Sequence, residues 1–344
     1  MTSKIVISKT ALATLAAAAL WGASPALADR GNNPPENNPK IVGDFDYGVC
    51  RGTNPKCYHN WMETRDNKVL LYTRTAGPRH ANLGPALAPG MNPPLTPAHV
   101  VQNAVIKWMG EKGVGVDYTE DVNSLAGALG PNSRYKAVIF ASTSRDTLWK
   151  HGTAVNPTRA VDTTTGAHLD AGKTALRQFL RQGGGFVGIH NAFGTEYNWP
   201  YYEGLLGNAN YYDHGQFQNG DVKIVAHDSS TDGLPARFGF KDEWYNLVPF
   251  PTKVKFLATV DEDTLATKRT THPGHGNFHP IAWCQYYDGG RAWLTTLGHD
   301  RDAFTDGSSF PGQAQFKQLI VNGILSAMGN LPFCVTSERD RDDD

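Results

Sequence analysis

The sequence predicts an α/β protein with a mostly parallel central sheet. In the first half of the chain, short apolar runs alternate with helical patterns at the spacing typical of βαβ units. A triple glycine, Gly183–Gly185, leads into the apolar run Phe186–Ile189 and then into His190. A buried strand that ends on a titratable side chain is how open α/β sheets build their sites. With 40% hydrophobic residues among 344, the chain can also bury a sizeable core.

The first half contains the predicted parallel strands and the helices that connect them. Thr96 and Pro97 predict a helix start, with Thr96 as the N-cap and Pro97 at the first helical position, and Gly110 and Gly113 predict its end. A second helix is predicted over 169–182, after a polar, irregular stretch at 142–167. The predicted strands span 69–73, 114–118, 135–141 and 186–189.

The second half predicts further strands and one closing helix. Asp288-Gly289-Gly290 predicts a hairpin turn between the last two strands. The closing helix spans 313–328, with Gly329 and Asn330 as its C-cap. No break in composition demands a second domain, and no internal repeat is visible. The predicted strands span 221–226, 253–260, 281–287 and 291–297.

The two ends of the chain are predicted to lie outside the fold. Residues 1–28 have the order of a secretory signal: basic Lys4 and Lys9, an apolar stretch, then small residues before Asp29. The alternative, a transmembrane anchor, is disfavoured because the apolar run is too short to span a bilayer. Residues 29–40 are expected to be a disordered mature N-terminus, 41–334 the folded domain, and 335–344 a polar disordered tail.

Charge and cysteine content narrow the function classes. The formal net charge of -1 offers no electrostatic basis for nucleic-acid or membrane partners, and it leaves the oligomeric state open. Export, to a bacterial periplasm or beyond, makes disulfides expected. The four cysteines allow three pairings, of which we favour Cys50–Cys57 with Cys284–Cys334. No Cys-x-x-Cys supports a zinc ribbon or a thioredoxin-like motif.

Three histidines follow three different predicted strands. His80, His190 and His299 each come after an apolar run, and the carboxyl ends of parallel strands meet at one edge of a sheet. A histidine there can act as a base, a hydrogen-bond donor or a metal ligand. The competing interpretation for any one of them, in a chain with 12 histidines, is a structural residue that caps the sheet.

Two further segments combine polar and aromatic side chains. Tyr211-Tyr212 precede Asp213-His214, a mixture that suits a sugar but is equally compatible with an aromatic surface loop. Asp242-Glu243 precede Trp244-Tyr245, and a carboxylate there can serve as acid, base or orienting group. On spacing alone, a solvated charge pair at the start of a strand is favoured over a functional role for the acidic pair.

The histidines between residues 272 and 279 are predicted to lie in a loop. His272, His275 and His279 have spacings of three and four, but the intervening Pro273 and Gly274 exclude a helix, so a dedicated metal site is disfavoured. His279 can still approach the site. The chain lacks the Gly-x-Ser-x-Gly elbow, the phosphate-binding Gly-x-x-x-x-Gly-Lys loop and the His-Glu-x-x-His zinc motif.

Taken in order, these motifs resemble the ThuA-like (trehalose utilisation) family over about residues 66–330. The departures from the family pattern are the insert at 142–167 and the cysteine-bearing N-terminal segment. The matching segments are 75–80, 183–190, 199–207, His214, 233–235, 242–245, 279–283 and 297–299.

The resemblance implies a fold and a substrate class. The fold is a flavodoxin-like, class I glutamine amidotransferase-like sandwich. His190 or its neighbour stands where an amidotransferase carries its nucleophilic cysteine, so glutaminase activity is not expected. The family is linked to sugar catabolism, including keto-sugars. The resemblance therefore points to a small-molecule carbohydrate as the partner.

The leading hypothesis is a secreted carbohydrate-active protein, a hydrolase or lyase that cleaves or modifies a glycoside or keto-sugar. The alternatives are a non-catalytic sugar-binding protein and a metal-dependent hydrolase that uses a divalent ion such as zinc. His80, His190 and His214 are the candidate metal ligands. The predicted catalytic residues are His190, Glu243 and His299; the predicted substrate-binding residues are His80, Asn191, Tyr212, His214, Asp242, Trp244 and Tyr245.

Overall fold

The computed structural model describes residues 48–62, 65–148, 171–268 and 272–335. These residues belong to one compact unit that begins at Asp46. The predicted signal peptide, the segment 29–40, the tail from residue 336 and most of the insert at 142–167 lie outside the described residues. No helix formed by the described residues has the length and apolarity needed to cross a membrane.

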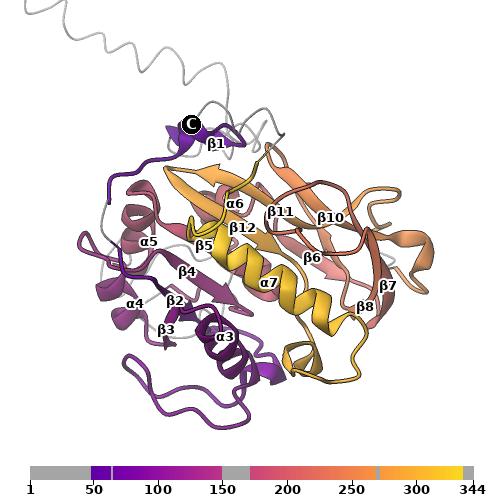
Figure 1. Cartoon of the computed structure of the whole chain (residues 1–344), viewed down its shortest axis with the longest axis horizontal. Helices are drawn as coiled ribbons and strands as arrows, with labels where there is room; N and C mark the ends of the chain where they lie inside the picture. Colours follow the sequence, from indigo (N-terminus) through magenta and orange to yellow (C-terminus); the bar gives the residue numbers. More distant parts are fainter. Residues whose placement is uncertain (1–47, 63–64, 149–170, 269–271, 336–344) are drawn as a thin grey trace, which may run out of the picture. The chain divides into compact units, whose positions relative to one another are not determined.

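A ten-stranded sheet forms the centre of the described structure (Figure 1). Its order is β3-β2-β4-β5-β12-β11-β10-β7-β8, and β1 pairs with β11. Pairing is parallel from β3 to β12 and antiparallel from β12 to β8. The strands are β1 (Arg51–Gly52), β2 (Lys68–Tyr72), β3 (Gly115–Thr119), β4 (Ala137–Ala141), β5 (Gly185–Ile189), β7 (Gln218–Ile224), β8 (Arg237–Asp242), β10 (Lys255–Asp261), β11 (His279–Tyr287) and β12 (Gly290–Thr295).

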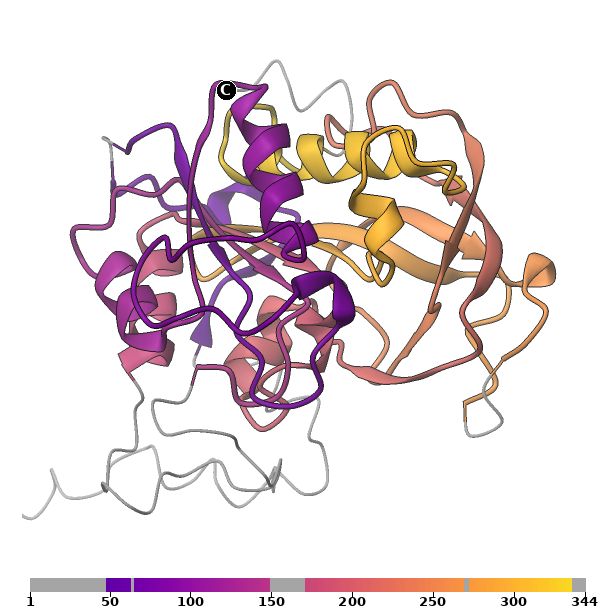
Figure 2. The same cartoon turned by 90° about the horizontal axis from the view of Figure 1, so that it is seen from below.

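Helices cover both faces of the sheet, which confirms the predicted α/β class (Figure 2). The parallel strands are apolar on both sides, so alternate residues enter different cores: Val69 packs with α3 and α7, and Leu70 packs with α4, α5 and α6. A second, two-stranded sheet pairs β6 (Tyr211–His214) with β9 (Tyr245–Leu247). The helices are α3 (Val100–Gly110), α4 (Val122–Ala128), α5 (Ala171–Arg181), α6 (Pro200–Leu205) and α7 (Gln313–Ala327).

The predicted start of the first helix is wrong. Helix α3 begins at Val100, after His99, and Thr96 does not cap it. Instead, the Thr96 N–H donates to His99 Nδ1 at 2.8 Å, and the Thr96 hydroxyl accepts from the Ala98 N–H at 3.3 Å. The Thr96-Pro97 pair thus forms a separate turn, because the imidazole of His99 supplies the acceptor that ties it together.

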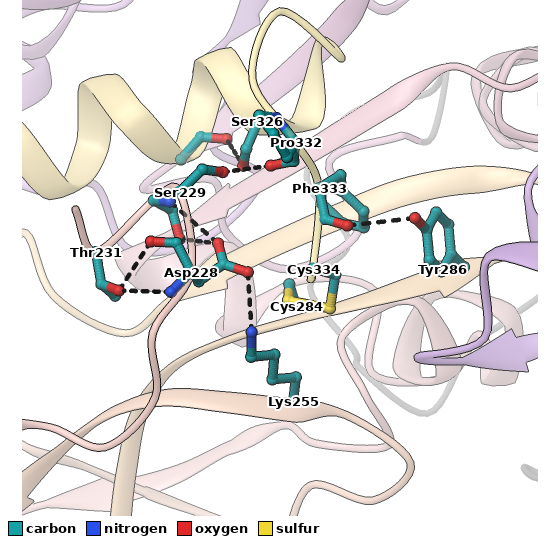
Figure 3. Close-up of a disulfide and its surroundings, with 12 residues drawn as sticks. Asp228, Ser229, Thr231, Lys255, Cys284, Tyr286, Ser326, Pro332, Phe333 and Cys334 are labelled. Atoms are coloured by element: carbon teal, nitrogen blue, oxygen red, sulfur yellow. Dashed lines mark hydrogen bonds and ion pairs between the residues drawn. A yellow bond between two sulfur atoms is a disulfide. The ribbon is translucent and has the colours of Figure 1, made fainter. Parts of the chain in front are cut away.

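The favoured cysteine pairing is confirmed. Cys50–Cys57 and Cys284–Cys334 have Cα–Cα distances of 5.2 and 5.7 Å. The second disulfide ties the segment after α7 to β11, where Tyr286 also donates its hydroxyl to the Phe333 carbonyl at 3.3 Å (Figure 3). The C-terminal segment of the domain is therefore held on the sheet by a covalent bond and by a side-chain contact.

Candidate functional site

The carboxyl ends of three parallel strands bring the three predicted histidines together. His80 follows β2, His190 follows β5 and His299 follows β12. The Nε2 atoms of His80 and His190 are 3.1 Å apart, and the ring of His299 lies 5.3 Å from that of His80 and 5.5 Å from that of His190. The convergence expected from the sequence is therefore present in the structure.

His190 is fully buried and held in one orientation. It has a positive φ of 52° and begins the 3-10 turn η6 (His190–Gly194) directly after β5. Its Nδ1–H donates to the Thr296 carbonyl at 2.9 Å, which leaves the Nε2 lone pair for the site. Burial, reinforced by the neighbouring His80 and His299, holds the pKa of His190 well below its usual value, so the ring is neutral.

Two donors crowd the single lone pair of His190 Nε2. The Tyr245 hydroxyl lies 2.9 Å from it and His80 Nε2 lies 3.1 Å from it. His80 is also neutral, because burial lowers its pKa to about 4, and its Nδ1 is buried with no hydrogen-bond partner in the described structure. A neutral imidazole nitrogen accepts one good hydrogen bond, so these polar atoms are not mutually satisfied.

Glu243 forms an ion pair with His299. Its Oε2 lies 3.1 Å from His299 Nδ1, off the line of a good hydrogen bond, and 4.0 Å from His190 Nε2; its Oε1 lies 3.6 Å from His214 Nε2. Burial alone raises the pKa of Glu243 and lowers that of His299, but the mutual attraction outweighs burial in both. The pKa of Glu243 is therefore lowered and that of His299 raised, which favours a carboxylate beside an imidazolium.

Asp242 holds the two members of this pair against each other. Its Oδ2 accepts the Gly298 N–H at 2.7 Å, and its Oδ1 accepts the N–H groups of Glu243 at 2.8 Å and His299 at 3.3 Å. Burial raises the pKa of Asp242 to about 7, although the backbone donors favour the ionised form. The alternative of a solvated charge pair is wrong for Asp242, which has no exposed surface.

The small β6–β9 sheet supplies the opposite wall. A bulge between Tyr211 and Asp213 turns Tyr211 and His214 toward the pocket and leaves Tyr212 exposed beside His272. His214 Nδ1 lies 2.6 Å from the Gly215 carbonyl, and on the other side of the ring Nε2 lies 3.6 Å from Glu243 Oε1.

The predicted histidine loop supports this wall from behind. His279 starts β11, and its Nε2 lies 2.9 Å from the Tyr245 carbonyl while its Nδ1 lies 2.7 Å from Glu262 Oε1. His275 Nε2 accepts the Leu247 N–H at 3.0 Å. These contacts join η7 (Glu262–Thr264) to β9 and account for both histidines as structural groups.

Glu262→Gln is expected to lower the free energy of unfolding by about 1–3 kcal/mol at pH 7, because the donors around Glu262 lose a charged acceptor. Burial opposes ionisation of Glu262, but hydrogen bonds from His279, Lys268 and the His275 N–H lower its pKa to about 2 from 4.5. The folded-state pKa is the lower one, so this stabilisation is complete above the unfolded pKa and is lost as pH falls toward 2.

Urea unfolding of wild type and Glu262→Gln at pH 7, 4 and 2.5 measures this difference, with the exposed Asp263→Asn as the matched control. A gap between the curves that stays constant down to pH 2.5 would show that the charge of Glu262 does not stabilise the fold.

A pocket of about 290 Å³ opens at this edge of the sheet. The predicted residues His80, Asn191, His214, Glu243 and Tyr245 line it. The sequence prediction missed six lining residues, of which Ser144 and Arg145 belong to the stretch read as irregular. A signal was available for Tyr211, which stands next to the predicted Tyr212. The six are Pro78, Ser144, Arg145, Gly194, Tyr197 and Tyr211.

Several predicted site residues do not line this pocket, among them His299, which contacts Glu243 from outside the lining. Asp242 lies behind the Glu243–His299 pair, and Tyr212 faces away. Trp244 is buried in the core with its indole N–H donated to the Gln218 carbonyl at 3.0 Å, so no surface remains for a ligand. His190 is separated from the pocket by His80 and Tyr245, which it contacts directly.

The histidines and Glu243 fit a divalent metal ion. Ligand atoms of His80, His190, Glu243 and His299 lie within 4.8 Å of one another. Two nitrogens bound tetrahedrally to zinc are about 3.3 Å apart, close to the 3.1 Å between His80 and His190 Nε2. The backbone anchor on His190 Nδ1 is the usual second partner of a metal-bound imidazole. His214, predicted as a ligand, lies outside this group but contacts Glu243.

Comparisons with solved structures agree with the fold. A putative ThuA-like protein from Bacteroides uniformis ATCC 8492 matches with 20% identity and a TM-score of 0.53, covering 77% of this chain and 92% of that chain. A putative ThuA-like protein from Parabacteroides merdae ATCC 43184 matches with 17% identity and a TM-score of 0.51, covering 77% and 90%. No curated protein matches this chain significantly.

The family model described as "ThuA: Trehalose utilisation" matches residues 68–327, from the first residue of β2 to the last of α7. The matched range includes every strand that contributes to the site, and it covers well over half of the chain. This protein therefore belongs to the ThuA family.

Proposed function

We propose that this protein is an exported enzyme that cleaves or modifies a glycoside or keto-sugar with a histidine/carboxylate site. The observation that carries the proposal is the Glu243 carboxylate, which lines the pocket and lies within 4.0 Å of nitrogens of His299, His214 and His190. Acid/base chemistry needs a group within hydrogen-bond reach of substrate, and the position of Glu243 on the pocket wall supports that role.

The titratable groups of the site have different proposed roles, one as base and one as acid. Glu243 is the proposed base, because its lowered pKa keeps it ionised to accept a proton from a sugar hydroxyl or a water. His299, with its raised pKa, is the proposed acid that returns a proton to the leaving oxygen. His190, predicted as a catalytic residue, is proposed to act by positioning His80 and Tyr245, which lie between it and the pocket.

A carbohydrate is supported by the pocket and by the family. Tyr197 and Tyr211 offer ring faces to the C–H surface of a sugar, and Asn191 and His214 offer polar groups to its hydroxyls. The family description, trehalose utilisation, belongs to the same chemistry. Export is supported by the two disulfides and by the signal-like first 28 residues.

Incubation with a panel of glycosides and 3-keto-glycosides, followed by analysis of the released sugars, tests the proposal. Turnover of at least one member is expected. The competing function, sugar binding without catalysis, predicts saturable binding with no product and a change only in affinity for Glu243→Gln. If no member of the panel is bound or turned over, both functions are ruled out.

A second candidate function, a metal-dependent hydrolase, is favoured by the unsatisfied His80–His190 pair. His80 and His190 would hold the ion with Glu243 and His299, and the ion would supply a Lewis acid and an activated water. In this case Glu243 positions the ion rather than accepting a proton.

Zinc content should separate these two candidates. Untagged wild type that holds a metal centre would carry about one ion per chain, and His80→Ala would lose most of it because a nitrogen ligand is gone. The exposed His227→Ala is the matched control. Metal-free wild type that keeps its turnover after chelation would eliminate the metal-dependent candidate.

A further inference from the structure

Arg145 presents a positive charge to the pocket that no residue of the described structure neutralises. Its guanidinium lies 5.4 Å from the ring centre of Tyr197, and within the described ranges no carboxylate forms an ion pair with it. The carboxylate across the pocket, Glu243, is engaged by His299. An arginine on a pocket wall without an acidic partner is a ready site for a ligand anion.

The backbone of Arg145 is held on both sides. Its N–H donates to the Gly194 carbonyl at 2.8 Å, and its carbonyl accepts the Glu196 N–H at 3.0 Å. The residue has a positive φ of 57°, a conformation that a side-chain-bearing residue adopts only where surrounding contacts impose it. The loop after β4 thus places Arg145 against the loop after β5, beside Asn191.

The side chain of Arg145 is also confined. A Cβ atom on Gly77 would lie 2.3 Å from Arg145 Cγ, so the side chain passes over Gly77 at a distance that no other residue there permits. On the pocket side, the ring of Tyr197 supports the guanidinium. The close approach to Gly77 and the contact with the Tyr197 ring therefore restrict the Arg145 side chain in the absence of ligand. This restriction reduces the conformational entropy that the side chain loses on binding.

We propose that the sugar bound in this pocket carries a carboxylate, as in a uronic or aldonic acid, and that Arg145 binds that carboxylate as the specificity-determining residue. This rests on the proposed function. The planar guanidinium matches a carboxylate through two parallel N–H···O bonds.

The pocket charges favour a carboxylate over a phosphate. No lysine and no second arginine lines the pocket within the described residues. Glu243 is paired with His299, so the Arg145 guanidinium is the cationic group without an acidic partner that a carboxylate monoanion would neutralise. A phosphate dianion would leave a negative charge among partly buried groups without a second cation, which is unfavourable.

Titration calorimetry with a hexuronate, its uncharged hexuronamide, the parent hexose and its 6-phosphate tests the proposal. Wild type should bind the hexuronate roughly 10- to 100-fold more tightly than the amide, the range expected for a charged hydrogen-bonded contact. Arg145→Gln should remove that preference, Arg145→Lys should retain part of it, and Gly77→Ala should weaken it because Arg145 must move.

Arg134→Gln is the matched control, since it removes an arginine that is exposed and paired with Asp66 outside the pocket. Circular dichroism and thermal unfolding establish that each variant is folded. Equal wild-type affinity for acid and amide, tighter binding of the phosphate, or a preference that survives Arg145→Gln would overturn the proposal. If only neutral sugars are turned over, the acidic substrate is refuted and the proposed carbohydrate-active enzyme stands. If no sugar binds at all, both the acidic substrate and the proposed function are refuted.

Discussion

Glu243→Gln is expected to lower kcat by about 10²- to 10⁴-fold, the contribution typical of a positioned acid or base. Glutamine keeps the shape of the side chain but can neither take a proton nor attract the imidazolium of His299. The ion pair of 3.1 Å would become a neutral contact, so the pKa of His299 should also fall. The assay is turnover of the sugar identified in the panel, with affinity measured separately by calorimetry.

The exposed Glu111→Gln is the control for this variant, because it removes a carboxylate that pairs with Lys317 on the surface, away from the pocket. Thermal unfolding of both variants shows whether the fold is kept. If Glu243→Gln retains wild-type kcat, Glu243 takes no part in the chemistry. If it alters affinity while no substrate is ever turned over, sugar binding is the function.

Removing the Cys284–Cys334 disulfide is expected to lower the free energy of unfolding by about 4 kcal/mol. The bond closes a loop with a sequence separation of 50, and the entropy of an unfolded chain constrained in this way gives that value. The Cys284→Ser/Cys334→Ser variant also frees the segment after α7, which Tyr286 and Phe333 help to hold on β11 (Figure 3). Guanidinium unfolding monitored by tryptophan fluorescence measures the loss.

The Cys50→Ser/Cys57→Ser variant is the matched comparison for this prediction. Its loop has a sequence separation of 7, and the same relation gives about 2 kcal/mol. The longer loop should therefore cost more when opened. Equal losses from both variants would mean that native contacts, and not loop length, determine the stabilisation.

Elements with a strong local pattern were predictable, and elements without one were not. The strands β2, β4, β5, β11 and β12 consist of continuous apolar runs, and α5 and α7 are long enough to show helical periodicity, so local pattern sufficed. The elements α4, α6, β6, β8 and β9 span 3 to 7 residues and take their structure from packing on neighbours. The start of α3 shows the same limit. Thr96 is a residue type that often caps helices, but its backbone N–H is bonded to the His99 imidazole and the helix begins only at Val100.

The predicted site shows a parallel contrast between residues at strand ends and residues on loops. His80, His190 and His299 follow strands, so their convergence was readable from chain order. Tyr212 was chosen over Tyr211, and only the bulge in β6 reverses that choice. Asp242 and Glu243 are adjacent in sequence, yet the first is buried on backbone N–H groups and the second faces the pocket.

By itself, the sequence determined the α/β class, the family and the strand edge at which His80, His190 and His299 meet, whereas it left three disulfide pairings open. These follow from apolar runs, motif order and the rule that parallel strands end together. Only the tertiary structure decided that His190 is buried and neutral, that Glu243 pairs with His299, and that Arg145 enters the pocket over Gly77. Burial, side-chain direction and charge pairing arise from contacts between loops distant in sequence, and no local pattern encodes them.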